Sequence, residues 1–398
     1  MNKLREAFRE YYTLRAPLIF VPKVERREVM LVSFEGVVSR HIAVDGLQSL
    51  RALLIREAPR HAYYSVGLYE RPSARSMSEK GLMGAELLFD IDADHLGVPE
   101  CDEGLAWRCK SCGRSGEGMP PDSCPECGSS ELESLDWISE ACLEAAKRET
   151  VRLLKIVLDD LGVSEESMMI YYTGHRGYHI RVLSEAVLGL GKDERRELAS
   201  HIIGRSFDPR EVFKTKGAAV FTPTVDEGGW RGRVARFLLD IVERTPPRWV
   251  DRSLHQTLLR RGEELVKCLR DGVPLLNPDK RLIKSLRELA AEYVSREAVK
   301  IDEMVTPDTT RLTRIPNSLH GKTGLRAMAL SLEELERFSP LRDAVGLGED
   351  PLKVRVTAPV PKFTIKGEWY GPFAEGEEVE LPTYAAALVV LKGRGVVS

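Results

Sequence analysis

Several features that would narrow the class of protein are missing from this sequence of 398 residues. It has no run of 18 apolar residues and its first 15 residues are charged throughout, so we expect neither a membrane span nor a signal peptide. It has no internal repeat or low-complexity segment, so a repeat architecture is not expected. It also has no excess of basic charge: 58 Lys and Arg face 61 Asp and Glu, for a net charge of −3. Any contact with nucleic acid must therefore come from local clusters of Lys and Arg.

Cysteine is scarce, and the seven that occur are an odd number. Four of them form two C-x-x-C pairs, which favours metal binding in a reducing compartment over a disulfide framework. We therefore expect an intracellular, cytoplasmic protein. Hydrophobic residues make up 43%, which is enough for a sizeable core and excludes a disordered chain. The length predicts two or three domains.

Residues 86–95 combine an apolar segment with closely spaced aspartates, and this stretch is central to the interpretation of the other motifs. Its apolar residues predict a strand that Asp90 and Asp92 interrupt. Because residues two apart on a strand point to the same face, the two carboxylates repel each other and lose hydration. A divalent cation resolves both problems, and oxygen ligands suit Mg²⁺ or Mn²⁺. The alternative is a strand end at which Asp90, Asp92 and Asp94 are simply solvated.

The two C-x-x-C pairs predict a zinc ribbon. They are separated by eleven residues in a stretch rich in Gly, Pro and Ser, and their ligands are Cys109, Cys112, Cys124 and Cys127. The stretch is too short and polar to bury a core, and four thiolates leave no open coordination position, so zinc is expected to hold the segment together. The alternatives are redox-active or merely buried thiols, and a ligand set in which Cys101 replaces one of the four.

Two further polar stretches predict a site for a metal-bound polyphosphate. Strands at 168–172 and 178–183 flank a Thr-Gly-His-Arg-Gly turn, and a basic loop runs from 311 to 324. Arg and His side chains donate to phosphate oxygens, while carboxylates hold the cation that bridges them. Each piece has an alternative interpretation. His179 could be a buried strand histidine, Arg176 a solvated turn residue, and Arg311 with Arg314 a surface stripe.

Residues 184–300 have a different character, because helical patterns dominate there. These patterns cover 193–204, 234–242, 254–269 and 279–299. We predict a helical insertion in a main domain that resumes near residue 301.

Taken in order, these pieces resemble the small, catalytic subunit of the archaeal and eukaryotic-type DNA primase. The matching motifs are Arg27-Glu28, Arg40-His41, Phe89-Asp-Ile-Asp92, Thr173-Gly-His-Arg-Gly-Tyr-His179, Gly229-Trp-Arg-Gly-Arg233, Ile301-Asp302 and Arg314-x-Pro-x-Ser-Leu-His-Gly-Lys-Thr-Gly324. The resemblance implies an α/β (α+β) fold, the primase catalytic fold of the archaeo-eukaryotic primase superfamily. Its mixed β-sheet core would comprise 1–183 and 301–398, with a zinc-binding insertion at about 101–130 and a helical subdomain at 184–300.

The resemblance also implies roles for individual residues. Three aspartates would bind the catalytic metal: Asp90, Asp92 and, eighteen residues before His320, Asp302, with Asp308 as the nearby rival. The implied nucleotide-binding residues are Arg40, Thr173, His175, Arg176, His179, Arg314 and His320. Two departures from the family pattern stand out. Thr173 replaces the usual serine but keeps the hydroxyl, and two C-x-x-C pairs replace the commoner mixed Cys/His zinc ligands.

The implied function is DNA-templated synthesis of short RNA primers on single-stranded DNA by two-metal nucleotidyl transfer, at the replication fork. Deoxynucleotide use is left open. Mg²⁺ or Mn²⁺ would be catalytic and Zn²⁺ structural. The implied partners are the large primase subunit, a single-stranded DNA template and ribonucleoside triphosphates. The large subunit carries the family's iron–sulfur domain. No membrane partner is expected. The alternatives are a primase-polymerase or repair polymerase of the same superfamily, and a non-catalytic zinc-ribbon protein that binds nucleic acid.

Overall fold

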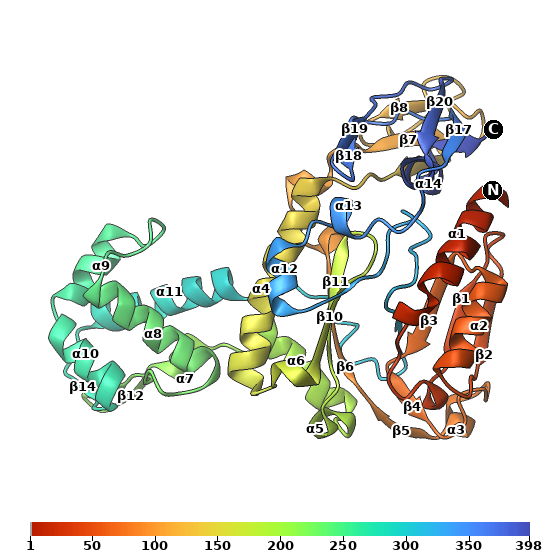
Figure 1. Cartoon of the computed structure of the whole chain (residues 1–398). Helices are drawn as coiled ribbons and strands as arrows, with labels where there is room; N and C mark the ends of the chain where they lie inside the picture. Colours follow the sequence, from red (N-terminus) through yellow and green to blue (C-terminus); the bar gives the residue numbers. More distant parts are fainter. Residues whose placement is uncertain (1) are drawn as a thin grey trace. The chain divides into compact units, whose positions relative to one another are not determined.

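The computed structural model describes residues 2–398, apart from the side chain of His95 (Figure 1). The chain divides into two compact units. Unit 1 comprises Met1–Thr150, Glu166–Lys192 and Met304–Ser398, and unit 2 comprises Val151–Glu165 and Asp193–Glu303. Helices and small sheets are mixed along the whole chain, which confirms the predicted α+β class.

Two four-stranded antiparallel sheets form the centre of unit 1. The first has the order β15-β3-β1-β2 and consists of β15 (Leu312–Arg314), β3 (His61–Ser65), β1 (Val29–Val32) and β2 (Val38–Ile42). The second has the order β16-β10-β11-β6 and consists of β16 (Ala329–Leu330), β10 (Met168–Tyr172), β11 (Gly177–Val182) and β6 (Leu87–Asp92). Strands far apart in the sequence are therefore neighbours in each sheet.

A buried ion-pair triad ties the two sheets together. Glu86, directly before β6, pairs with Arg181 of β11 and with Arg27, which precedes β1. All three side chains are almost completely buried. Arg27 also donates from Nη1 to the carbonyl oxygen of Ser65 at the end of β3, at 2.7 Å. Because a buried charge without a partner is costly, these three residues require one another.

The remaining elements of unit 1 surround these sheets or form smaller ones. The helices are α1 (Asn2–Arg15), α2 (Leu47–Glu57), α3 (Met77–Lys80), α5 (Glu185–Leu188), α12 (Leu332–Arg337), α13 (Pro340–Asp343) and α14 (Thr383–Leu391). The smaller sheets are β4 (Gly67–Tyr69) with β5 (Leu82–Ala85); β8 (Ser115–Glu117), β7 (Ala106–Cys109) and β9 (Leu132–Leu135); β18 (Phe363–Ile365) with β19 (Glu368–Tyr370); and β20 (Glu378–Pro382), β17 (Pro351–Val356) and β21 (Gly395–Val397). Every residue of α14 is buried, because this apolar helix packs on the β20-β17-β21 sheet.

Unit 2 is mainly helical. Its helices are α6 (Lys192–Ile202), α7 (Pro209–Val212), α8 (Gly229–Glu243), α9 (Arg252–Leu259), α10 (Gly262–Asp271) and α11 (Lys280–Glu297), and its one sheet is β12 (Lys214–Lys216), β13 (Ala219–Phe221) and β14 (Leu275–Leu276). The long helix α4 (Glu140–Leu161) crosses the boundary between the two units after Thr150. In its second half, buried Asp160 accepts hydrogen bonds from His201 at 2.9 Å and from Arg233 at 2.8 Å.

Two predicted elements are wrong in detail. Residues 61–69, for which the sequence by itself predicts one continuous strand, form two strands, β3 and β4, in different sheets. A side chain at Gly67 would come within 2.9 Å of the Thr309 carbonyl oxygen, so only glycine lets the chain pass there. The single helix predicted for 254–269 is α9 and α10, because the backbone of Arg261 leaves the helical conformation between them.

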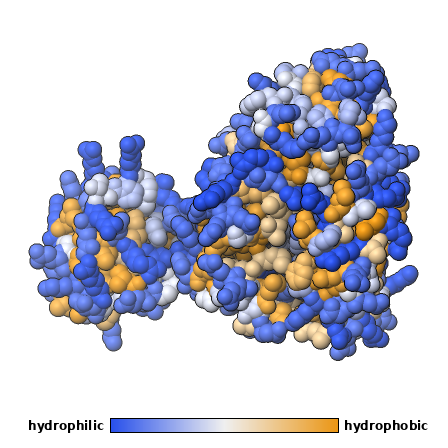
Figure 2. All heavy atoms as spheres, viewed as in Figure 1, coloured by the Kyte–Doolittle hydropathy of each residue, from blue (hydrophilic) through white to orange (hydrophobic). Residues whose placement is uncertain are grey.

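The surface in Figure 2 mixes hydrophilic and hydrophobic residues, with no continuous apolar band on the visible face. In residues 2–398, none of the helices has both the length and the apolar character needed to span a bilayer.

Candidate active site and metal centre

A cavity of about 280 Å³ in unit 1 gathers most of the predicted site residues. Its wall consists of Tyr63, Leu88, Asp90, Asp92, Thr173, His175, Gly177, His179, Arg311, Leu312, Thr313, Arg314 and His320. These residues come from β6, from β11 and the turn before it, from β3 and β15, and from the loop that follows β15. The acidic strand, the glycine turn and the basic loop therefore meet at one place, as predicted.

The two aspartates share the cavity wall because they are two residues apart on β6. The antiparallel register sets His179 of β11 opposite Asp90, and Gly177 opposite Asp92. His179 Nε2 is 3.2 Å from Asp90 Oδ1. The neighbouring strand thus supplies a partner for the first carboxylate and leaves no side chain opposite the second.

The other nitrogen of His179 connects the two sheets. Its Nδ1 lies 3.0 Å from the hydroxyl oxygens of both Tyr171 on β10 and Thr313 on β15. Tyr171 and Thr313 are also hydrogen-bonded to each other. His179 is therefore fixed on both sides of its ring, and it fixes the orientation of the Asp90 carboxylate in turn.

The glycine turn lies directly against the basic loop. Gly174 has φ +86°, and a Cβ there would lie 2.7 Å from the Cβ of His320, so no other residue fits. Thr323 of the loop donates its hydroxyl hydrogen to the Gly174 carbonyl oxygen at 2.5 Å. The rings of His175 and His320 stack in parallel, with centroids 5.0 Å apart and an interplanar angle of 6°.

Arg314 brings a buried cation to the cavity wall. Its guanidinium lies over the ring of Tyr63, 4.7 Å from the centroid, and its Nη2 is 3.2 Å from Nδ1 of His61. Its Nη1 is buried and has no hydrogen-bond partner among the described residues. Burial, with the charge of Arg314 adding to it, lowers the pKa of His61 to about 3 and holds the pKa of His320 well below its usual value.

Arg176 lies beside this wall and forms ion pairs with two carboxylates. It is buried, and it pairs with Asp94 and, from Nη2 at 2.5 Å, with Asp136. Lys392 donates to the same oxygen of Asp136 at 2.9 Å. Burial raises the pKa of Asp136, but the contact with the His175 ring and the charges of Lys392 and Arg176 outweigh this and lower it well below its usual range.

Besides Arg176, three predicted residues lie outside the cavity wall. Asp302, half-buried, is in unit 2 directly before the return to unit 1. Its rival Asp308 is in unit 1, where its carboxylate accepts hydrogen bonds from Thr310. Arg40 is on β2, at the opposite edge of its sheet from β15, and donates to buried Glu28 at 3.2 Å. The roles assigned to Asp302 and Arg40 stay predictions.

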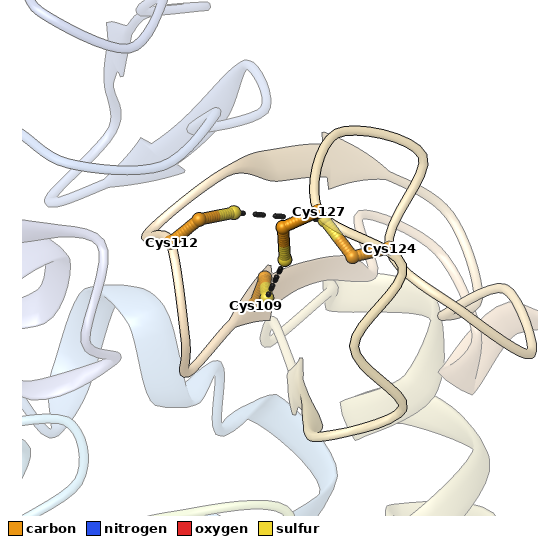
Figure 3. Close-up of side chains that lie close together, drawn as sticks. All are labelled: Cys109, Cys112, Cys124 and Cys127. Atoms are coloured by element: carbon orange, nitrogen blue, oxygen red, sulfur yellow. Dashed lines mark hydrogen bonds between the residues drawn. The ribbon is translucent and has the colours of Figure 1, made fainter.

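A second cluster contains the four predicted zinc ligands. The sulfur atoms of Cys109, Cys112, Cys124 and Cys127 all lie within 4.8 Å of one another, and Figure 3 shows their side chains converging on one point. The Sγ atoms of Cys109 and Cys127 are 3.6 Å apart, as are those of Cys112 and Cys124. Zn–S bonds of about 2.3 Å in a tetrahedron separate sulfurs by roughly 3.8 Å, so this cluster can bind zinc.

Cys101 is not one of these ligands. It forms a disulfide with Cys142 of α4, with a Cα–Cα distance of 4.7 Å. The alternative ligand set containing Cys101 is therefore wrong. The cysteines of the two C-x-x-C pairs form the predicted cluster, and the disulfide involves other cysteines. The sequence offered no sign of this pair, because its members are 41 residues apart.

Sequence analysis also missed several residues that support the cavity. They are Tyr63, Tyr171, Thr313, Asp136 and Lys392. Thr313 lies within the predicted basic loop at 311–324, and the other four lie in no motif that predicts chemistry. Lys392 has one local feature, since it is the charged residue that ends an otherwise apolar helical stretch.

Comparisons with known proteins identify the family of this chain. A family model described as "DNA primase small subunit" matches residues 122–332, just over half of the chain. Two curated relatives named "DNA primase small subunit PriS" come from Cenarchaeum symbiosum and Archaeoglobus fulgidus. They are 32% and 31% identical to this chain, and each alignment covers 98% of this chain and 96% of the relative.

Among solved structures, the polymerase domain of Mycobacterium tuberculosis ligase D in complex with DNA matches 83% of this chain and 82% of its own. The identity is 11% and the TM-score is 0.37, and no argument rests on a score this low. The family model and the full-length relatives are sufficient by themselves: this chain belongs to the family of DNA primase small subunits.

Proposed function

We propose that the cavity of unit 1 is the place where this DNA primase joins ribonucleotides into short primers along single-stranded DNA. One observation supports this assignment above the others. Asp90 and Asp92 line the cavity of about 280 Å³ together with three histidines and Arg314. Carboxylates that attract a cation beside donors that attract phosphate are what a metal-bound nucleoside triphosphate needs.

The acidic part of the wall is the proposed metal site. Asp90 and Asp92 would hold Mg²⁺ or Mn²⁺, since their oxygens are hard ligands. The metal-binding role of Asp302 rests on the family resemblance alone. A cation bound there would activate the attacking 3′-hydroxyl and offset the charge of the leaving pyrophosphate. The protein's own contribution is rigidity: His179 is hydrogen-bonded on both ring nitrogens and fixes the Asp90 carboxylate at 3.2 Å.

The basic part of the wall is the proposed phosphate site. Arg314 offers a buried Nη1 without a partner among the described residues. His320 and His175 lie beside it, and Thr173 contributes a hydroxyl. Arg176 is less free to act in this way, because a phosphate would have to compete with Asp94 and Asp136 for its guanidinium.

The rest of the chain fits supporting roles. Unit 1 would be the catalytic core and unit 2 the helical subdomain. Zinc bound by the four cysteines would be structural, because a Cys₄ site has no open coordination position. We further propose that the chain works with a large primase subunit on a DNA template and uses ribonucleoside triphosphates.

Primer synthesis by the purified chain tests this proposal. The chain is incubated with labelled ribonucleotides, poly-dT and Mg²⁺ or Mn²⁺, and the products are resolved by length. We expect short labelled oligomers that depend on template and on cation and that are absent for Asp90→Asn. Products that form equally well with Asp90→Asn would contradict the assigned site. Efficient gap filling or strand displacement by this chain alone would favour a repair polymerase instead.

A further inference from the structure

We propose that Lys392, together with Asp136, positions the His175 ring and keeps it neutral, with its single ring proton on Nδ1. The inference rests on the proposed function of the cavity, to which His175 belongs. It makes Lys392, at the end of the buried helix α14, a positioning residue for nucleotide binding.

The contacts of Lys392 dictate which atom of His175 carries the proton. The Lys392 side chain is completely buried, and its Nζ lies 2.9 Å from Asp136 Oδ2 and 2.8 Å from His175 Nε2. An ammonium has three donors and no acceptor, so Nε2 must be unprotonated in order to accept from it. The neutral ring then carries its proton on Nδ1.

The charges around His175 favour the same state. Burial lowers the pKa of Lys392 to about 8, against the pull of Asp136, so the ammonium keeps its charge at pH 7. Burial, and then the charge of Lys392, lowers the pKa of His175 to about 3, although Asp136 opposes both. Arg176 is a further cation nearby. Asp136 Oδ2 is 3.4 Å from Nε2, and it already receives the stronger bonds from Lys392 and Arg176.

The stacked partner of His175 is arranged in a matching way. His320 accepts a hydrogen bond at Nδ1 from the backbone N–H of Lys322, at 3.1 Å, so its own proton lies on Nε2 when it is neutral. Two protonated rings stacked 5.0 Å apart would repel each other. His61 packs edge-on against His320 and accepts at Nδ1 from Arg314. In each of the three histidine rings, one nitrogen thus accepts a hydrogen bond from a donor of the protein.

The consequence for the site is a set of neutral donors of fixed geometry. A neutral N–H donor binds phosphate without adding a charge that titrates near pH 6.5. The backbone of the turn is held as well, because Tyr172 donates its hydroxyl hydrogen to the His175 carbonyl oxygen at 2.5 Å. Nucleotide binding should therefore not depend on the protonation of His175 between pH 6 and pH 8.

The direct test is the tautomer of His175 in the unsubstituted chain, measured by ¹⁵N NMR of the imidazole nitrogens. The His175 signals are assigned by their loss in His175→Gln. We expect a protonated Nδ1, an unprotonated Nε2, and no change between pH 6 and pH 7, where Lys392 keeps its charge. A proton on Nε2, or titration of the ring within this range, would overturn the proposal. This measurement needs no catalysis, so its failure is distinct from a failure of primer synthesis.

The second test is Lys392→Met, which removes the ammonium and nearly preserves the chain length. With the cation gone, His175 can protonate and pair with Asp136, so its titration should move into the observable range. We expect the KM for nucleotide to rise roughly five- to tenfold, the size of one hydrogen bond, with a smaller change in kcat. Lys392→Arg, which keeps charge and donors, should recover part of the loss.

The matched control is Lys353→Met, which removes an exposed lysine from β17 in the same unit. It should leave both the KM and the His175 signals unchanged. An unchanged tautomer and KM in Lys392→Met would assign Lys392 a purely structural part and overturn the inference. If Lys392→Met does not fold, the tautomer in the unsubstituted chain still decides the question.

Discussion

The four-cysteine cluster and the carboxylate–histidine cavity are held in place by different means. The cluster draws all its ligands from residues 109 to 127, on two turns of one small sheet. The cavity draws its wall from residues as far apart as Tyr63 and His320, and from both central sheets. In the cluster, the metal itself would hold the segment together. In the cavity, the surrounding fold holds like charges together before any ligand arrives.

The cavity and the cysteine cluster should therefore differ in how their local structure responds to the loss of one ligand. A site that the fold assembles can lose a carboxylate and keep its shape, because like-charge repulsion falls. A site that the metal assembles loses its shape along with the ligand.

Loss of either aspartate should abolish activity without harming the fold. We expect Asp90→Asn and Asp92→Asn each to lower nucleotide incorporation by more than roughly 1,000-fold, about 4 kcal/mol of transition-state stabilisation. The melting temperature should hold or rise. The control is Asp102→Asn, an exposed acid in the same region, which should change neither quantity. Incorporation within tenfold of the unsubstituted chain would remove Asp90 or Asp92 from the metal site.

Loss of a cysteine ligand should have the opposite signature. In Cys112→Ser, or after chelation, we expect amide hydrogen exchange in residues 106–135 to accelerate by at least about 100-fold, or roughly 2.7 kcal/mol of local stability. Exchange in β6 and β11 should change little. Cys268→Ser in α10 is the matched control, since that cysteine is outside the cluster. Freshly purified chain without bound zinc would contradict the prediction.

Loss of the buried guanidinium should weaken nucleotide binding. Arg314→Gln removes a charged donor whose Nη1 is unpaired among the described residues, so the KM for nucleotide should rise roughly 10- to 150-fold, or about 1.5–3 kcal/mol. His320→Gln should act in the same direction. Template binding, measured by fluorescence anisotropy, should be unchanged in both variants. Arg355→Gln, an exposed arginine on β17, serves as the control. Weakened template binding with an unchanged KM would assign these residues to the DNA instead.

Acid should destabilise the cavity through its buried neutral histidines. The folded-state pKa of His175 is lowered to about 3, so below pH 6.5 the unfolded chain binds a proton that the folded chain does not. The free energy of unfolding therefore falls as the pH drops, by about 1.4 kcal/mol for this histidine at pH 5.5. Denaturant unfolding at pH 7 and pH 5.5 should show a smaller decrease for His175→Gln than for the unsubstituted chain. Equal decreases would contradict the neutral state of the ring.

The parts of the molecule that the sequence predicted are those encoded locally. The strand periodicity of β6, β10 and β11 and the C-x-x-C spacing each depend on residues close together in the chain, and the structure has them as predicted. The candidate nucleotide site was predicted through family motifs, and its role stays a prediction. Asp136 and Lys392 could not be predicted, because they are 256 residues apart and only the packing of α14 brings them together. The same holds for Tyr171 and Thr313, whose contact depends on the arrangement of two sheets.

Helix α4 limits where the chain can be divided to produce unit 1 or unit 2 alone. It is one continuous helix, yet its residues after Thr150 belong to unit 2. A shortened chain that lacked residues 193–303 would keep Asp160, whose side chain is only 2% exposed, and would delete its partners His201 and Arg233. It would also expose the apolar face of the second half of this amphipathic helix, which includes Leu154 and Val157. An expression clone of unit 2 should therefore carry residues 151–165 joined to 193–303 by a linker, and a clone of unit 1 needs polar replacements on the orphaned half of α4.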